Sequence, residues 1–231
     1  MNTKFGLRIL VMSAVAALVA PTSIYGDVTL YTDAAAFATA VASNGYSQQV
    51  LDFDSETAGT TYAAPSTIGH ITFDSYGPPD LIVTDDFATT SGSNYLGMDS
   101  VGLANQIVGG YNFDMSFSSS NAVGFYIVTG EIANVSLFDN DIQLVVPGSG
   151  TTLLDVDDLQ GTVGGTDSVF FVGLIDDMNT FTTAQVRYDA AAVGTIVYNI
   201  DDIVTGAIPE PGSMMVLALS TLALIARRKR Y

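Results

Sequence analysis

A series of short β-type segments constrains the fold of this chain more than any other feature. Eleven stretches rich in Val, Ile, Phe, Tyr and Thr follow one another between Gln48 and Val204, separated by Gly, Asp, Asn, Pro or Ser. The first set of residues favours strands and the second favours turns. In the segment YNFDMSF, which begins at Tyr111, apolar and polar residues alternate as in a strand with one buried face. We therefore expect a mainly β fold: a single antiparallel β-sandwich or jelly-roll-like domain.

One segment ahead of these strands has helical character. Thr32 or Asp33 can cap the free N–H groups at its start, and Ala34–Ala42 are mostly good helix formers. An Asn-Gly pair then ends it. The sequence predicts one short N-terminal helix, and the residues expected to face the core are Phe37, Val41 and Ala38.

Charge is distributed unevenly along the chain. Six of the seven basic residues lie in the two end segments, and Arg187 is the only base between Asp27 and Gly206. That stretch has 23 acidic residues and a formal charge of −22. Such a surface repels nucleic acid and anionic lipid and attracts divalent cations. The composition excludes nucleic acid as a partner, and the absence of cysteine excludes disulfides and thiol chemistry.

The first residues have the pattern of a secretory signal peptide. Lys4 and Arg8 precede an apolar run of twelve residues, Ile9–Ala20, and small residues offer cleavage points after Ala20 or Gly26. A buried core helix is the alternative, but a short apolar run behind two bases at the extreme N-terminus is typical of a signal peptide. We expect residues 1–26 to be a signal peptide, residues 27–206 to form the domain, and the mature protein to leave the cytoplasm.

The chain ends on a Pro-Glu-Pro triplet, an uncharged stretch and a basic cluster. As a helix, the stretch together with the residues just before it is long enough to span a hydrocarbon core. The basic cluster would then stay in the cytoplasm and the acidic domain outside. An ordinary single-pass anchor would show the same pattern. The residues are Pro209, Glu210 and Pro211, then Gly212–Ala226, then Arg227, Arg228, Lys229 and Arg230.

In this order at the C-terminus, the three parts resemble the PEP-CTERM sorting signal of exopolysaccharide-producing Gram-negative bacteria. The resemblance covers residues 207–231, about a tenth of the chain. It implies a precursor anchored transiently in the inner membrane, which an exosortase-type membrane protease recognises and cuts. The final location would be the cell surface or the extracellular matrix. The two ends of the middle stretch also resemble those of β-sandwich domains commonly attached to this tail, which implies a fold and no activity.

Acidic residues gather near both ends of the predicted domain. Asp52, Asp54 and Glu56 occupy alternating positions, which in a strand puts all three side chains on one face. Asp201 and Asp202 lie near the other end, and pairing of the first and last strands would bring the two groups together. Carboxylates from separate strands suit calcium, and jelly-roll carbohydrate-binding modules, which these ends resemble, often carry a structural calcium ion. The alternative is solvated strand edges and turns. The expected ligands are Asp54, Glu56, Asp201 and Asp202.

Patterns for catalysis are weak. His70 is the only histidine, so a multi-histidine zinc site is excluded, and no GxSxG motif occurs. We assign no catalytic residue and expect a non-enzymatic, surface-sorted acidic protein of the cell envelope or exopolysaccharide matrix, with a glycan as candidate ligand. A secreted carboxylate-based glycosidase or polysaccharide lyase is the alternative. Since the chain has no Trp, a sugar site would rely on tyrosines near turns, such as Tyr62, Tyr76, Tyr95 and Tyr111.

Overall fold

The computed structural model describes residues 28–75, 79–99, 105–108, 111–129, 142–154, 156–188 and 197–209. In these ranges the chain is mainly β, as the sequence predicts, with sixteen strands, one α-helix and one 3₁₀ helix, η1 (Val156–Asp158). The predicted signal peptide, uncharged stretch and basic cluster lie outside these ranges. No helix within them is long and apolar enough to cross a membrane.

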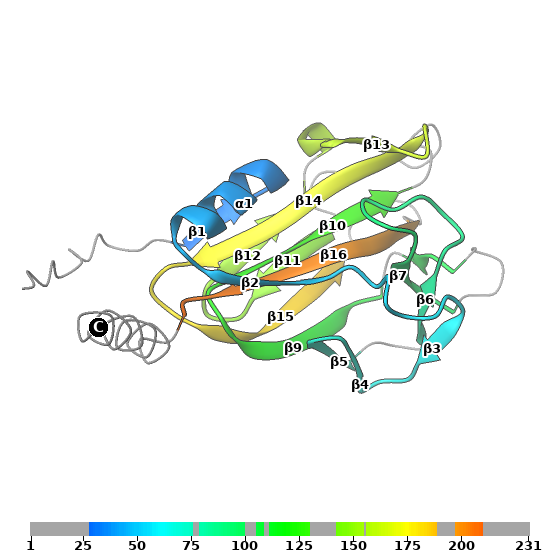
Figure 1. Ribbon diagram of the computed structural model, residues 1–231, viewed down its shortest axis with the longest axis horizontal. Helices are drawn as coiled ribbons and strands as arrows, with labels where there is room; N and C mark the ends of the chain where they lie inside the picture. The colour runs from blue at the N-terminus through cyan, green and yellow to red at the C-terminus, as the bar shows by residue number, and fades with distance from the viewer. Residues whose placement is uncertain are drawn as a thin grey trace, which may run out of the picture.

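The strands form two antiparallel sheets (Figure 1). The main path of the ten-stranded large sheet is β1 (Val28–Tyr31), β14 (Asp167–Asp176), β10 (Ala122–Thr129), β16 (Val197–Ala207), β7 (Tyr95–Met98), β6 (Leu81–Thr84) and β3 (Thr60–Tyr62). Off this path, β13 (Gly161–Val163) pairs with β14, while β2 (Ser47–Leu51) and β8 (Ile107–Val108) pair with β16. The six-stranded small sheet has the order β12 (Gly150–Leu153), β11 (Ile142–Val146), β15 (Phe181–Tyr188), β9 (Phe113–Ser120), β5 (Ile71–Ser75) and β4 (Ser66–Ile68).

The inner faces of the two sheets share one hydrophobic core. Phe113 and Met115 of the small sheet are completely buried, as are Phe125 and Ile127 of the large sheet, and all four belong to one cluster. The alternation predicted for the YNFDMSF segment is confirmed, since its apolar side chains point into this core. Two antiparallel sheets around a common core are the arrangement of a β-sandwich.

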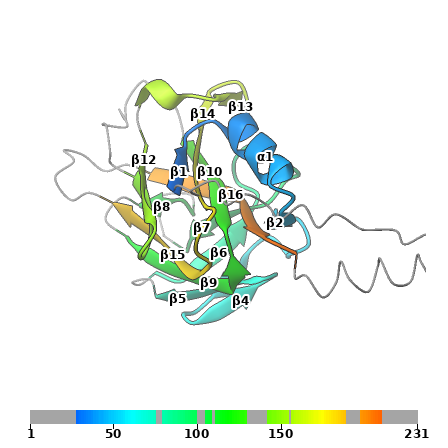
Figure 2. The ribbon, with the colours of Figure 1, turned by 90° about the vertical axis from the view of Figure 1, so that its left-hand side faces the viewer.

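Helix α1 (Ala34–Ser43) lies on the outer face of the large sheet, on the side away from the small sheet (Figure 2). Asp33 caps it by accepting a hydrogen bond from the Ala36 backbone N–H at 2.9 Å. Phe37 and Val41 are buried against the sheet, as predicted. The prediction for Ala38 is wrong: it is exposed, because the stripe that meets the sheet is the one containing the other two residues.

Strands β2 and β16, which come from the two ends of the domain, are neighbours in the large sheet. Their antiparallel register pairs Leu51 with Ile203 and Ser47 with Ala207. The calcium hypothesis requires the first and last predicted strands to pair, and the structure shows this pairing, although β1 precedes both. The pairing of β2 with β16 brings the residues after Leu51 toward the middle of β16, where Asp201 and Asp202 lie.

Candidate functional site

The residues after β2 form a turn where the sequence predicts a continuing strand. The strand ends at Leu51, and Phe53 adopts a backbone φ of 61° with its side chain completely buried. The Asp52 carboxylate accepts a hydrogen bond from the Asp54 backbone N–H at 3.2 Å, which is typical of an aspartate turn. The prediction that Asp52, Asp54 and Glu56 share one strand face is wrong, because the left-handed residue that fills the core redirects the chain.

Asp54 and Glu56 bind different partners. Asp54 Oδ1 accepts hydrogen bonds from the backbone N–H of Ser93 at 2.8 Å and of Asn94 at 3.1 Å. Glu56 Oε2 accepts one from the Tyr62 hydroxyl at 2.7 Å. Burial and this hydrogen bond raise the pKa of Tyr62 to about 12, so the phenol stays protonated. Asp54 thus fixes the loop that contains Ser93 and Asn94, whereas the Glu56 side chain bonds to Tyr62 of β3.

A β-bulge in β16 places Asp201 and Asp202 on the same face of the large sheet. The register with β10 shifts at this point, and Asp202 has a φ of 49°, a left-handed conformation that aspartate tolerates better than most residues. Ile200 and Ile203 both point into the core. The extra residue therefore leaves both intervening aspartates directed outward, where a regular strand would alternate them.

Thr90 and Ser91 hold both aspartates. Asp201 Oδ2 accepts hydrogen bonds from the Thr90 N–H at 2.8 Å, the Thr90 hydroxyl at 2.7 Å and the Ser91 N–H at 3.2 Å. Asp202 accepts from the Ser91 hydroxyl at 2.6 Å, and its Oδ2 lies 2.9 Å from the Thr90 hydroxyl. The Thr90 hydroxyl has one proton, so it cannot donate fully to both carboxylates.

The surroundings of Asp201 favour its neutral form. The side chain is completely buried, and burial is the main reason why its pKa rises to about 6. Hydrogen bonds from Thr90 and Ser91 oppose the rise, while the negative charge of Asp202 adds to it. With one proton on Asp201, that carboxyl donates to Thr90 Oγ1 and the Thr90 hydroxyl donates to Asp202. A single proton then satisfies all three groups.

Residues 89–94, which we call the clasp loop, connect the two groups of predicted calcium ligands. The loop donates to Asp201 and Asp202 at one end and to Asp54 at the other. Between them, Gly92 has a φ of +52°, and a Cβ there would lie 1.5 Å from Asp54 Oδ2, so glycine is required for this contact. Among the described residues, no three acidic or histidine side chains are grouped as metal ligands. The calcium site stays a prediction.

A groove of about 510 Å³ lies beside the clasp loop, on the outer face of the large sheet. A second hollow of about 260 Å³ adjoins it toward β2, and Ala34, Ala38, Tyr126 and Asp202 line both. The α1 wall consists of alanines, whose small side chains leave the space open. The other residues lining the larger groove are Ala35, Thr90, Gln160, Gly161, Thr162, Val163 and Val169.

Tyr126 supplies the aromatic surface of this groove. Its ring packs edge-on against Phe171, with a centroid distance of 5.2 Å. Burial raises the pKa of Tyr126, and the charges of Asp202, Asp201 and Asp33 add to the rise. Sequence reasoning missed this tyrosine because it looked for tyrosines near turns, and Tyr126 lies within a strand. The period of β10, with Phe125 and Ile127 in the core, would have placed Tyr126 on the outer face.

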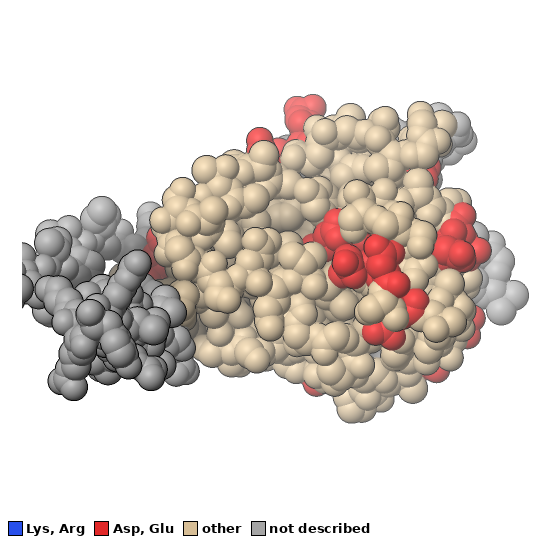
Figure 3. Space-filling view, viewed as in Figure 1, with Lys and Arg blue, Asp and Glu red and all other residues tan. Residues whose placement is uncertain are grey.

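The groove lies on an acidic face. Figure 3 shows this face of the molecule, with acidic side chains gathered over the loops near β7 and no lysine or arginine on its coloured part. Arg187 is the only base in the described ranges, and it belongs to the small sheet. There it pairs with Asp114 at 2.5 Å. The described part of the chain therefore supplies no cation to balance the carboxylates of the groove.

Comparison with known proteins explains the end of the chain. A family model of the PEP-CTERM protein-sorting motif matches residues 207–230. The chain carries a PEP-CTERM sorting motif. The motif implies an exported protein that is sorted at the membrane and processed by an exosortase. No curated protein and no solved structure matches the chain significantly.

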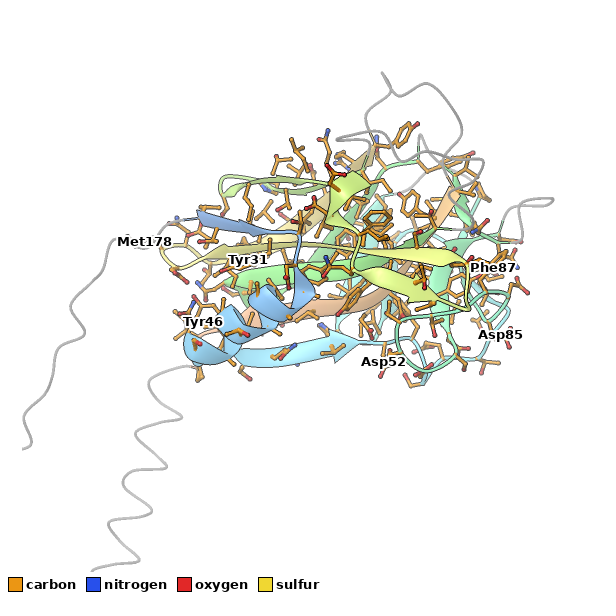
Figure 4. All side chains as sticks on the ribbon, turned by 90° about the horizontal axis from the view of Figure 1, so that it is seen from above. Tyr31, Tyr46, Asp52, Asp85, Phe87 and Met178 are labelled. Atoms are coloured by element: carbon orange, nitrogen blue, oxygen red, sulfur yellow. The ribbon has the colours of Figure 1, made fainter. Side chains whose placement is uncertain are left out.

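The sorting motif starts where the sandwich ends. The match begins at Ala207, the last residue of β16, and the Ile208 backbone N–H donates to Asn121 Oδ1 at 3.3 Å. The Asn121 amide also donates to the backbone carbonyls of Asp176 and Asn179 at 3.1 and 3.3 Å, which ties the exit to the β14–β15 turn. Met178 of this turn lies at the opposite end of the molecule from Asp52 and Asp85 (Figure 4).

Of the seven residues predicted to carry the sorting signal, only Pro209 falls within the described ranges. Pro209 is exposed, as access by a processing enzyme requires. The others lie outside the described residues: Glu210, Pro211, Arg227, Arg228, Lys229 and Arg230.

Proposed function

We propose that this chain is a non-enzymatic binding protein of the cell envelope or exopolysaccharide matrix, and that its groove binds a glycan. The observation that carries the proposal is the combination of Tyr126 with polar side chains around one open groove. Sugar rings present apolar faces that pack on aromatic rings, and their hydroxyls bond to carboxylates, amides and hydroxyls. Asp202, Gln160 and Thr162 offer those three groups. The sorting motif supports a place where glycans are available.

The carboxylates of the groove support binding over hydrolysis. Glycoside hydrolysis requires two carboxyl groups on either side of the scissile bond. Among the described residues lining the groove, Asp202 is the only acidic one. Asp201 is next to it on the same strand and completely buried, so the two do not face each other across a ligand. The alternative, a glycosidase or polysaccharide lyase, predicts release of shortened sugars from a polysaccharide.

Replacement of Tyr126 by alanine is expected to weaken glycan binding about tenfold or more, because the aromatic packing surface is lost. Tyr126→Phe keeps the ring and is expected to remain within about threefold of wild type. Affinities can be measured by calorimetry with oligosaccharides selected on a glycan array, together with an assay for new reducing ends. Unchanged binding by Tyr126→Ala would place the glycan elsewhere, and accumulation of cleaved product would favour the enzyme.

We also propose a structural calcium ion at the clasp loop, with Asp54, Glu56, Asp201 and Asp202 as the predicted ligands. An ion bound only by the folded state stabilises it by about 2.7 kcal/mol at a hundredfold excess over its Kd. Calcium is therefore expected to raise the melting temperature above its value in sodium at equal ionic strength, and Asp202→Asn should remove the difference. Equal shifts in both salts would mean that hydrogen bonds within the protein hold these four carboxylates without a calcium ion.

A further inference from the structure

The charge of the groove limits which glycan it can accept. Asp202 lines the groove directly, Asp201 lies beneath the clasp loop, and Asp33 acts on Tyr126 from the start of α1. The partial positive charge of the α1 N-terminus works in the opposite direction, since Ala34 and Ala35 also line the groove. It is largely cancelled, because Asp33 accepts a hydrogen bond from a first-turn N–H. The net charge around the groove is therefore negative.

The aspartate pair lacks one donor when both carboxylates are ionised. Thr90 Oγ1 lies 2.7 Å from Asp201 Oδ2 and 2.9 Å from Asp202 Oδ2, and its single proton can point at only one of them. Asp201 is buried and also accepts hydrogen bonds from three backbone N–H groups. Asp202 is only partly buried and lines both hollows, so it is the carboxylate that a ligand can reach.

An ammonium group on the ligand supplies both the missing donor and the missing positive charge. Its N–H groups can donate to Asp202, and a charge-assisted hydrogen bond is stronger than one between neutral groups. The neighbouring face of Tyr126 attracts a cation as well. A carboxylated sugar would instead meet Asp202 with a like charge and find no base among the described residues that line the groove.

We propose that the groove selects an amine-bearing saccharide, with its ammonium group paired to Asp202 and its ring packed against Tyr126. This rests on the proposed function, because it names the class of glycan that the same groove would take.

The test compares three oligosaccharides of equal length, namely a glucosamine oligomer, its fully N-acetylated counterpart and a uronic acid oligomer. Each is titrated by calorimetry into the full-length chain, produced without an exosortase and solubilised in a neutral detergent. The buffer contains a calcium chelator, so that no calcium ion competes for Asp202. At low salt, the glucosamine oligomer is expected to bind about tenfold more tightly than the N-acetylated one. The preference should shrink as sodium chloride screens the charges, and the uronic acid oligomer should bind most weakly.

Two matched variants separate the groove from the general charge of the molecule. Asp202→Asn removes one charge at the groove and keeps a side chain that tolerates the left-handed backbone, and its melting temperature shows whether the fold is retained. Asp85→Asn removes one exposed charge outside the residues that line the groove. Asp202→Asn is expected to abolish the preference for the amine, so that the glucosamine and N-acetylated oligomers bind with equal affinity, at or below the wild-type affinity for the N-acetylated oligomer. Asp85→Asn should leave both unchanged.

The remaining outcomes distinguish this inference from the proposed function. Equal affinity for the glucosamine and N-acetylated oligomers, or tighter binding of the uronic acid oligomer, overturns the amine selection and leaves glycan binding standing. An equal loss of preference in both variants shows attraction by net charge alone and also overturns it. Failure of all three oligomers and of a wider glycan array to bind overturns the proposed function itself.

Discussion

Between pH 4 and pH 7, the free energy of unfolding is expected to fall by about 2 kcal/mol through the ionisation of Asp201 alone. Burial raises the pKa of this carboxyl from 3.8 to about 6 in the folded state. The folded protein therefore holds a proton that the unfolded chain has already released. The stabilisation is fully present below pH 3.8 and is lost as the pH rises through about 6. A shift of this size corresponds to about 3 kcal/mol in total, most of it within that window.

Asp201→Asn provides the measurement, because asparagine does not titrate. The variant loses some stability at every pH, because the NH2 of asparagine meets a backbone N–H in either orientation. In wild type, Asp201 Oδ1 accepts from the Asp202 N–H at 2.9 Å, and Oδ2 accepts from the N–H groups of Thr90 and Ser91. The deciding quantity is the slope of the free energy of unfolding against pH. Denaturant unfolding between pH 4 and pH 7 should show a smaller decline of this free energy for the variant than for wild type. Asp85→Asn, with the same change of net charge on an exposed residue, should keep the wild-type slope. Parallel curves for wild type and Asp201→Asn would contradict the prediction.

Another buried carboxyl titrates in a different window and does not obscure this effect. Burial would raise the pKa of Asp176, but hydrogen bonds from Ser149, Met178 and Asn179 outweigh it and lower the pKa below 3.8. Stability from Asp176 is thus present above pH 3.8 and is lost as the pH falls through its lower folded value. The two carboxyls act on opposite sides of pH 3.8. Burial lowers the pKa of His70 from 6.5, so the stability that His70 contributes is lost as the pH falls, which is a slope of opposite sign in the same window as Asp201. The contribution of Asp201 is therefore the difference between the wild-type and Asp201→Asn curves.

The features of the fold that the sequence predicted are those that depend on a local pattern of residues. The alternation that starts at Tyr111 predicted a strand with one buried face, and a cap at Thr32 or Asp33 predicted where α1 begins. The pairing of the two end strands was a condition of the calcium hypothesis, and the structure shows it between β2 and β16. In each case the deciding interactions lie within a few residues, or follow from the need to bury one face.

The candidate site depends on two residues with left-handed backbones, and alternation alone does not predict such residues. Strand β2 ends at Leu51, and the left-handed backbone of Phe53 redirects the chain within an alternating pattern, so the predicted face of carboxylates does not form. Asp202 forms the bulge that directs two consecutive aspartates outward. The sequence contained a signal for the bulge at Asp202, because the spacing between the core residues Tyr198, Ile200 and Ile203 changes from two to three. The groove itself joins residues from α1, β10, β13 and β16, which no local pattern brings together.

Neutralising the basic cluster at the C-terminus is expected to abolish sorting almost completely. Each Lys or Arg near the inner leaflet contributes about 1 kcal/mol of attraction to anionic lipid, so we expect four of them to favour a cytoplasmic chain end by about 4 kcal/mol. Replacing Arg227, Arg228, Lys229 and Arg230 by glutamine removes that attraction and the orientation signal. In a host that has an exosortase, immunoblots of cell fractions should then show untrimmed or mislocalised protein. A control with lysine at all four positions keeps the charge and should be processed as wild type.

A second variant separates the sorting motif from an ordinary membrane anchor. Replacing Pro209, Glu210 and Pro211 by alanine leaves the apolar stretch and the basic cluster intact, so the variant should still enter the membrane. If the exosortase reads the triplet, this variant is expected to accumulate as an untrimmed, membrane-bound precursor. If the tail were only a membrane anchor, the wild-type chain and the alanine variant would show the same processing and the same location. Normal trimming of the glutamine variant, or of the alanine variant, would contradict the role given to that part of the tail. The alanine changes begin one residue after Ile208, whose backbone N–H bonds to Asn121 of the sandwich.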